Sequence, residues 1–118
     1  MRFLRRMAST AYLTVAIRAD AKIRSTVKRD SKDRYWTATL KGSYVDIGRA
    51  IPYQDAVYEV FHGRNVFTVT KAEAYAVAFA AGGNAVPMYH PRHRTRIAYY
   101  EHFHVHNHTE DAHVWFLF

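Results

Sequence analysis

Apolar residues in the first quarter of the chain recur every three to four positions. That spacing places them along one side of an α-helix, so residues 8–29 are predicted to be helical. A polar segment at residues 30–33 then interrupts the pattern. The apolar positions of the stripe are Tyr12, Val15, Ala16, Ala19, Ile23 and Val27.

Beyond this helix, apolar and polar residues alternate over short segments, as they do in β-strands. Residues 34–40 are rich in aromatic and β-branched side chains and predict a strand. Gly42 marks a turn before a second extended segment at residues 44–48. A third extended run covers residues 65–69.

Two further helices are predicted in the middle of the chain. Pro52 stands near the start of one, and Gly63 follows its apolar stripe at the position of a left-handed C-terminal cap. Thr70 and Glu73 match a capping box at the start of the other. Residues 72–81 of that helix are so apolar that we expect it to be buried on most sides.

The end of the chain predicts a β-hairpin that follows a basic loop at residues 84–98. Residues 99–106 alternate, residues 107–112 are a polar turn, and residues 113–118 are apolar on both faces, as in a central strand. The predicted fold is therefore α+β. It has N-terminal helices packed on a small antiparallel sheet that ends in a C-terminal β-hairpin.

The composition indicates one folded domain without disulfides. A length of 118 residues suits a single domain, and 49% apolar with 15% aromatic residues excludes a disordered tail. The absence of cysteine excludes thiol catalysis and cysteine-ligated metal sites. No stretch approaches the ~18 apolar residues of a membrane span, and the basic start followed by residues 8–17 lacks a clean signal-peptide cleavage site.

The net charge of the chain indicates which class of binding partner to expect. The chain has 17 basic and 10 acidic residues, a net charge of +7 at pH 7. Such a surplus favours a polyanionic partner, with nucleic acid as the first candidate and a membrane surface or an acidic protein as the next.

Histidines are concentrated near the C-terminus, where seven of the eight lie between residues 90 and 113. Side chains at i and i+2 share one face of a strand, so His102 and His104 are predicted to share a face with Tyr100. Phe103 then points to the core on the opposite face. His106 and His108 follow the same parity but are nearest the turn, and we expect them to be bystanders.

The hairpin register decides whether a further histidine joins this face. With the turn at residues 107–112, His106 is predicted to pair with His113, and His104 to oppose Trp115. His113 then lies on the same face as the other imidazoles. A register error of one residue would turn it to the opposite face.

Three interpretations of these imidazoles remain open. Paired histidines can act as base and acid in metal-independent RNA cleavage, because the imidazole pKa lies near neutral pH. A histidine-x-histidine pair with a third histidine across the hairpin can instead hold Zn²⁺ or another nuclease metal. The third interpretation is a solvated polar strand face. We predict catalysis by His102, His104 and His113, without metal or cofactor.

Substrate contacts are predicted beside this face. Arg92, Arg94 and Arg96 in the basic loop are candidates for phosphate contacts. Tyr100 shares the parity of the imidazoles and is a further candidate. Positive charge there would stabilise the extra negative charge of the transition state.

Several segments together resemble the C-terminal toxin modules of bacterial polymorphic toxins, the variable ends of Rhs- and WapA-like secreted proteins. The resemblance covers about residues 21–118, and its most specific part is the Tyr-x-His-aromatic-His stretch followed by a histidine and an aromatic run. The segments that carry it are residues 46–57, 63–68, 99–104 and 113–118. Residues 1–20 have no counterpart in the pattern and are predicted to be an N-terminal extension or a remnant of a carrier chain.

The resemblance implies a toxin that is secreted as part of a larger protein and acts in the cytoplasm of a competing cell. A cognate immunity protein, acidic to match the basic toxin, would neutralise it. Many such modules are nucleases, so we expect an endoribonuclease acting on a cellular RNA such as tRNA, with RNA favoured over DNA. The pattern marks His102, His104 and His113, although Ala112 stands where glycine usually precedes the last histidine.

Three alternatives stay open beside this reading. A histidine-ligated metal nuclease would lose its activity in EDTA. A non-catalytic nucleic-acid-binding or interaction module would bind in a salt-dependent way without cleavage. A different toxin chemistry, such as modification of a nucleotide or protein, is the third.

Overall fold

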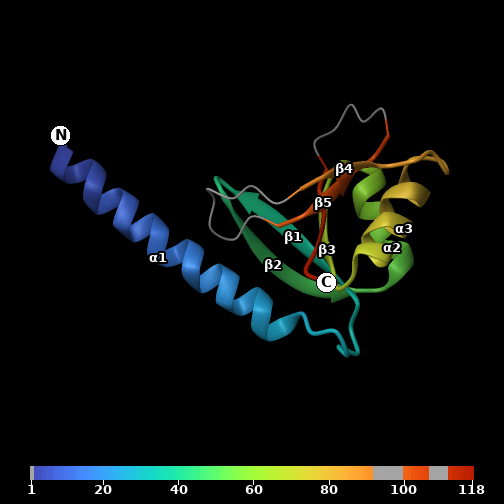
Figure 1. The fold of residues 1–118 in the computed structure, drawn as a ribbon, viewed down its shortest axis with the longest axis horizontal. Coiled ribbons are helices and arrows are strands. Elements are labelled where there is room, and N and C mark those ends of the chain that lie inside the picture. The colour runs from blue at the N-terminus through green and yellow to red at the C-terminus, as the bar shows by residue number, and fades with distance from the viewer. Residues whose placement is uncertain (1, 92–99, 107–111) are drawn as a thin grey trace.

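Helices and one mixed sheet make up the described part of the chain (Figure 1). The computed structural model describes residues 2–91, 100–106 and 112–118. The class is α+β, as predicted. The elements are α1 (Arg2–Thr26), β1 (Tyr35–Lys41), β2 (Tyr44–Ile51), α2 (Tyr53–Phe61), β3 (Asn65–Thr68), α3 (Lys71–Ala81), β4 (Met88–His90), β5 (His102–His104) and β6 (Val114–Phe116).

The six strands form a sheet with the order β2-β1-β3-β6-β5-β4. All neighbouring strands are antiparallel except β3 and β6, which run parallel with Val66 opposite Val114 and Thr68 opposite Phe116. The sheet is therefore mostly antiparallel, as predicted, with one parallel pair of strands. The apolar character of both faces of residues 113–118 predicted a central strand but carried no information on its direction relative to β3.

The C-terminal hairpin forms with a register two residues away from the predicted one. His102 pairs with Trp115 and Phe103 with Val114, so the predicted pairing of His106 with His113 is wrong. A shift of two residues keeps every side chain on its predicted face, because side chains alternate with a period of two.

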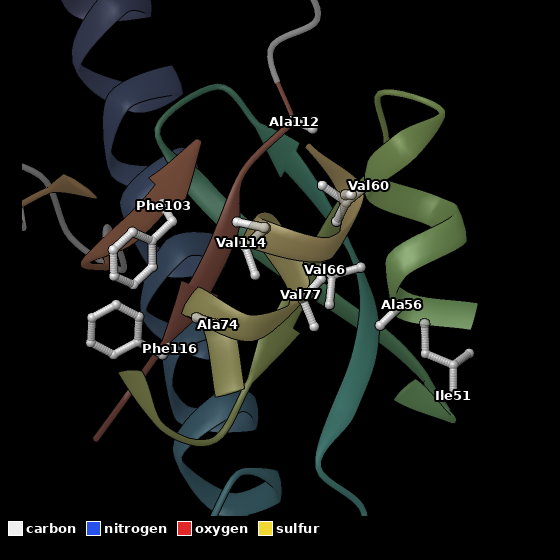
Figure 2. Close-up of a cluster of buried hydrophobic side chains, with 12 residues drawn as sticks. Ile51, Ala56, Val60, Val66, Ala74, Val77, Phe103, Ala112, Val114 and Phe116 are labelled. Carbon is white, nitrogen blue, oxygen red and sulfur yellow. The ribbon is translucent and has the colours of Figure 1, made fainter. Parts of the chain in front are cut away.

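Two hydrophobic clusters fill the two sides of the sheet. Alternation along β3 and β6 sends Val66 and Val114 to one side, and Phe67 and Trp115 to the other. Helices α2 and α3 cover the first side, as the close-up in Figure 2 shows. The C-terminal part of α1 covers the second side, where Ile23 and other apolar residues of the stripe are buried.

The helix-end signals fall where the sequence places them. Pro52 occupies the N-cap position of α2, and Gly63 after that helix has a φ of 81°. Thr70 and Glu73 form the predicted capping box of α3. The expectation that α3 is buried on most sides is wrong, because a helix lying on one face of a sheet keeps its outer side in solvent. Lys71, Ala72 and Tyr75 of this helix are exposed.

Helix α1 continues unbroken through the predicted boundary between residues 20 and 21, and its N-terminal end extends away from the sheet (Figure 1). Residues before that boundary contact the rest of the protein. Ala16 is 2% exposed, and the Tyr12 hydroxyl donates to the Lys41 carbonyl oxygen at 3.0 Å. Among the described residues, α1 and the other helices lack the combination of length and apolarity that crosses a membrane.

Candidate functional site

Four histidines, three in strands β4 and β5 and one immediately before the adjacent strand β6, bring their rings together on the α1 side of the sheet. We refer to His90, His102, His104 and His113 as the imidazole cluster. The ring centroids of His102 and His104 are 4.9 Å apart, and His113 lies 4.9 Å from His102 and 4.7 Å from His104. His90 lies 5.3 Å from His102 and 4.5 Å from His104. The three predicted catalytic residues are thus neighbours.

Strand pairing explains why these rings meet. His102 and His104 are two residues apart in β5, so their side chains lie on the same face of the strand. Phe103 between them points to the opposite face, where it is buried in the hydrophobic cluster under α2 and α3. His90 is the register partner of His102 across β4 and β5. His113 immediately precedes β6, whose residue Trp115 pairs with His102.

Hydrogen bonds fix the tautomers of the two β5 histidines. The Nδ1 atom of His102 lies 2.9 Å from the Tyr100 carbonyl oxygen, and that of His104 lies 3.0 Å from the Ala112 carbonyl oxygen. A carbonyl oxygen can only accept a hydrogen bond, so Nδ1 carries the proton in both rings. In the neutral imidazole the lone pair is then on Nε2.

Asn65 orients His113 from strand β3. Its Oδ1 atom accepts the His113 backbone N–H at 2.7 Å, which identifies the atom as oxygen because a backbone N–H only donates. The same oxygen lies 3.1 Å from Nδ1 of His113, so this ring also carries its proton on Nδ1. Trp115 stacks on the His113 ring with a centroid distance of 4.9 Å and an interplanar angle of 8°. His113 is thereby held in one rotamer by two elements.

The cluster is buried except at one edge. His102, His104 and His113 expose 1%, 5% and 8% of their surface, whereas His90 on the edge strand β4 is accessible to solvent. Burial lowers the pKa of His102 from its ordinary value of 6.5, and His90 lowers it further, against the opposing effect of the hydrogen bond to the Tyr100 carbonyl. Burial therefore favours the neutral form of the His102 ring.

Tyr100 lies beside the cluster in the core between α1 and the sheet. It is 3% exposed, packs edge-on against Phe67, and donates its hydroxyl to the Asp20 carboxylate of α1. This placement gives Tyr100 a structural role as a link between α1 and β5. Its predicted contact with substrate stays a prediction.

The remaining predicted residues divide into two groups. His106 is exposed, and its role as a bystander stays a prediction. The predicted phosphate-binding residues Arg92, Arg94 and Arg96 lie outside the described residues, as does His108.

Two residues of the site were missed at the sequence level. His90 belonged to a predicted loop, because Pro87 and Pro91 flank a segment that forms only the three-residue strand β4. Asn65 is 48 residues away from His113 in the chain, and only the parallel pairing of β3 with β6 brings them together. The clustering of histidines was an available signal for His90, whereas none existed for Asn65.

The geometry supports two kinds of chemistry. Adjacent imidazoles with defined tautomers can exchange protons with a bound substrate as base and acid. Imidazoles are also transition-metal ligands, and the ligand nitrogens of His90, His102 and His104 lie within 4.8 Å of one another.

No protein-family model, curated protein or solved structure matches this chain. The function is therefore inferred from the imidazole cluster and the charge of the protein.

Proposed function

We propose that this protein is an endoribonuclease that cleaves RNA by metal-independent histidine acid–base catalysis. The observation that carries the proposal is the grouping of His102, His104 and His113. Their ring centroids lie 4.7–4.9 Å from one another, and each ring has its Nδ1 bonded to an oxygen acceptor. The three Nε2 atoms are then the proton-exchanging atoms of the site.

The reaction needs one neutral and one protonated imidazole. The neutral ring takes the proton of a ribose 2′-hydroxyl, and the 2′-oxygen attacks the adjacent phosphorus. The protonated ring gives its proton to the departing 5′-oxygen, so that the products are a 2′,3′-cyclic phosphate and a 5′-hydroxyl. His102 suits the base because burial favours its neutral form. His104 and His113, whose ring centroids each lie 4.9 Å from that of His102, are the candidates for the acid.

Burial of the cluster sets a condition on this reaction. His102 exposes 1% of its surface, so a phosphodiester reaches it only when the groups that cover it move aside. His90 marks the side of the cluster that is open to solvent. The substrate therefore enters from the β4 edge, and apo geometry of this kind is compatible with a site that forms fully on binding.

The biological setting follows from the resemblance to polymorphic toxin modules and from the charge. A net charge of +7 favours RNA binding through phosphates. We propose that the domain is secreted as part of a larger toxin, attacks a cellular RNA such as tRNA in the cytoplasm of a target cell, and is neutralised by an acidic immunity protein. In this setting Arg92, Arg94 and Arg96 contribute phosphate contacts.

The test is cleavage of purified RNA by the purified protein in the presence of EDTA, with the end groups of the products determined. The proposal predicts 2′,3′-cyclic phosphate and 5′-hydroxyl ends. His104→Ala should abolish most of the cleavage, while the matched control His106→Ala, at an exposed position two residues after β5, should cleave like the wild type.

Two results would contradict the proposal. Cleavage that stops in EDTA, or that leaves 5′-phosphate ends, would indicate a metal nuclease. Salt-dependent RNA binding without cleavage would indicate a nucleic-acid-binding module.

A further inference from the structure

We infer that His90, His102 and His104 form a binding site for a transition-metal ion of the Zn²⁺ class. Their ligand nitrogens lie within 4.8 Å of one another, and the three residues come from two paired strands. Three histidines are the donor set with which Zn²⁺ keeps a further position for water.

The tautomers provide an observation that is independent of this grouping. Nδ1 of His102 and of His104 donates to a backbone carbonyl oxygen. Ligating histidines commonly hold one ring nitrogen in this way, which directs the lone pair of the other nitrogen to the metal. Both β5 histidines are therefore oriented and protonated as metal ligands are.

The type of ligand selects the type of ion. All three ligand atoms are imidazole nitrogens, which suit Zn²⁺, Cu²⁺ or Ni²⁺, whereas Mg²⁺ and Ca²⁺ require oxygen ligands. Tetrahedral Zn–N bonds of about 2.0–2.1 Å separate the ligand nitrogens by roughly 3.4 Å. Any larger separation between the ligand nitrogens has to be closed by movement of the three rings.

Access also favours an ion. His102 and His104 are buried, but His90 is accessible at the β4 edge, so an ion meets one ligand at the surface before it reaches the other two. An ion needs a far smaller opening than an RNA strand does.

Occupancy of the site has a consequence for catalysis, which rests on the proposed function. A metal bound to Nε2 of His102 and His104 would make these nitrogens unavailable for proton exchange with RNA. Zn²⁺ should therefore inhibit cleavage, and EDTA should restore it.

The experiment is titration of the metal-free protein with Co²⁺, followed by its visible absorption, and with Zn²⁺, followed by calorimetry. The wild type should bind one ion per chain, with the intense absorption of low-coordinate Co²⁺. Loss of even an outer partner of a ligating histidine costs about 10- to 100-fold in affinity. His90→Ala removes a ligand itself and should weaken binding at least 100-fold.

His90 is the preferred position for the substitution because it lies on an exposed edge strand, so the variant should keep the fold. Its circular dichroism spectrum verifies this. His62→Ala is the matched control, since His62 is an exposed histidine at the end of α2. As a second measurement, Zn²⁺ should raise the Tm of the wild type and of His62→Ala, but not that of His90→Ala.

The outcomes separate the metal site from the proposed function. Absence of saturable binding by the wild type, or unchanged affinity in His90→Ala, would overturn the metal site even if RNA is cleaved in EDTA. Binding that is lost in His90→Ala, with cleavage that requires the ion, would establish the site and overturn the metal-independent mechanism. Binding together with inhibition by Zn²⁺ supports both.

Discussion

Asn65 and His113 are joined by two hydrogen bonds to one atom. The side-chain oxygen of Asn65 lies 2.7 Å from the backbone nitrogen of His113 and 3.1 Å from its Nδ1. Asn65 opens strand β3 and His113 precedes the parallel strand β6, so this contact couples the sheet pairing to the orientation of one imidazole. Asn65 is therefore a positioning residue.

Replacing Asn65 should affect both stability and cleavage. Asn65→Ala leaves the His113 backbone N–H without its acceptor, which should cost about 1–3 kcal/mol of stability. It also removes the orienting bond to Nδ1, and cleavage should fall by about 10-fold or more, the scale of outer partners of functional histidines. Thermal unfolding and turnover measure the two effects separately.

Asn65→Asp distinguishes positioning from a merely structural role. The carboxylate keeps an acceptor oxygen for both His113 donors and should retain most of the cleavage activity. Its negative charge favours the protonated imidazole, so the pH–rate profile should move to higher pH. An Asn65→Asp protein as impaired as Asn65→Ala, with an unshifted profile, would remove Asn65 from the site.

The faces of the C-terminal hairpin were predictable from the sequence, but its register was not. The alternation in residues 99–106 placed His102 and His104 opposite Phe103, and this depends only on the period of the strand. The register depends on the turn geometry, and the structure pairs Phe103 with Val114, two residues away from the prediction. His102, His104 and His113 still share one face, because the error in the predicted register was an even number of residues.

The features that could not be predicted depend on contacts between segments that are far apart in the sequence. The parallel pair of β3 and β6 has no signature in either strand alone, since hydrophobic alternation does not encode direction. Local helix signals gave better predictions. Thr70 and Glu73, three residues apart, defined the start of α3, because a capping box is satisfied within one turn.

A substitution at Tyr100 distinguishes a structural role of this residue from the predicted contact with substrate. Tyr100→Phe removes the hydroxyl that donates to Asp20 and should lower stability by about 0.5–1.5 kcal/mol. Because the ring is buried, the KM for RNA should not change. A raised KM with unchanged stability would assign Tyr100 to substrate binding instead.

Ionisation of Glu73 is expected to make the free energy of unfolding depend on pH. Burial opposes ionisation of Glu73, but the hydrogen bonds from Arg34 and Thr70 and the charge of Arg34 outweigh it and lower the pKa below 4.5. Arg34 Nε and Nη2 donate to the two carboxylate oxygens at 2.7 and 2.8 Å. The ionised form is thus stabilised by folding, and its contribution is present above pH 4.5 and is lost as the pH falls through the folded-state pKa.

The expected result is a loss of about 1–3 kcal/mol in Glu73→Gln at pH 7, with a smaller difference from the wild type at acidic pH. Denaturant unfolding at several pH values measures it. Asp46→Asn is the matched control, since Asp46 pairs with Lys41 at an exposed position where an ion pair contributes about 0–1 kcal/mol. Equal effects of the two substitutions would show that the Arg34–Glu73 pair adds no more than a surface pair.

The most direct test of the proposed catalysis by the imidazole cluster is the state of total RNA in cells that express the domain or its His104→Ala variant. His104 lies within 5 Å of three other imidazole rings, so its loss should reduce turnover by ~10²-fold or more. His104→Gln is measured alongside it, because the longer polar side chain fills more of the buried space. We predict discrete RNA fragments with the wild type and intact RNA with both variants at equal levels of folded protein. RNA fragmented to the same extent by wild type and variants would contradict a catalytic role for the cluster.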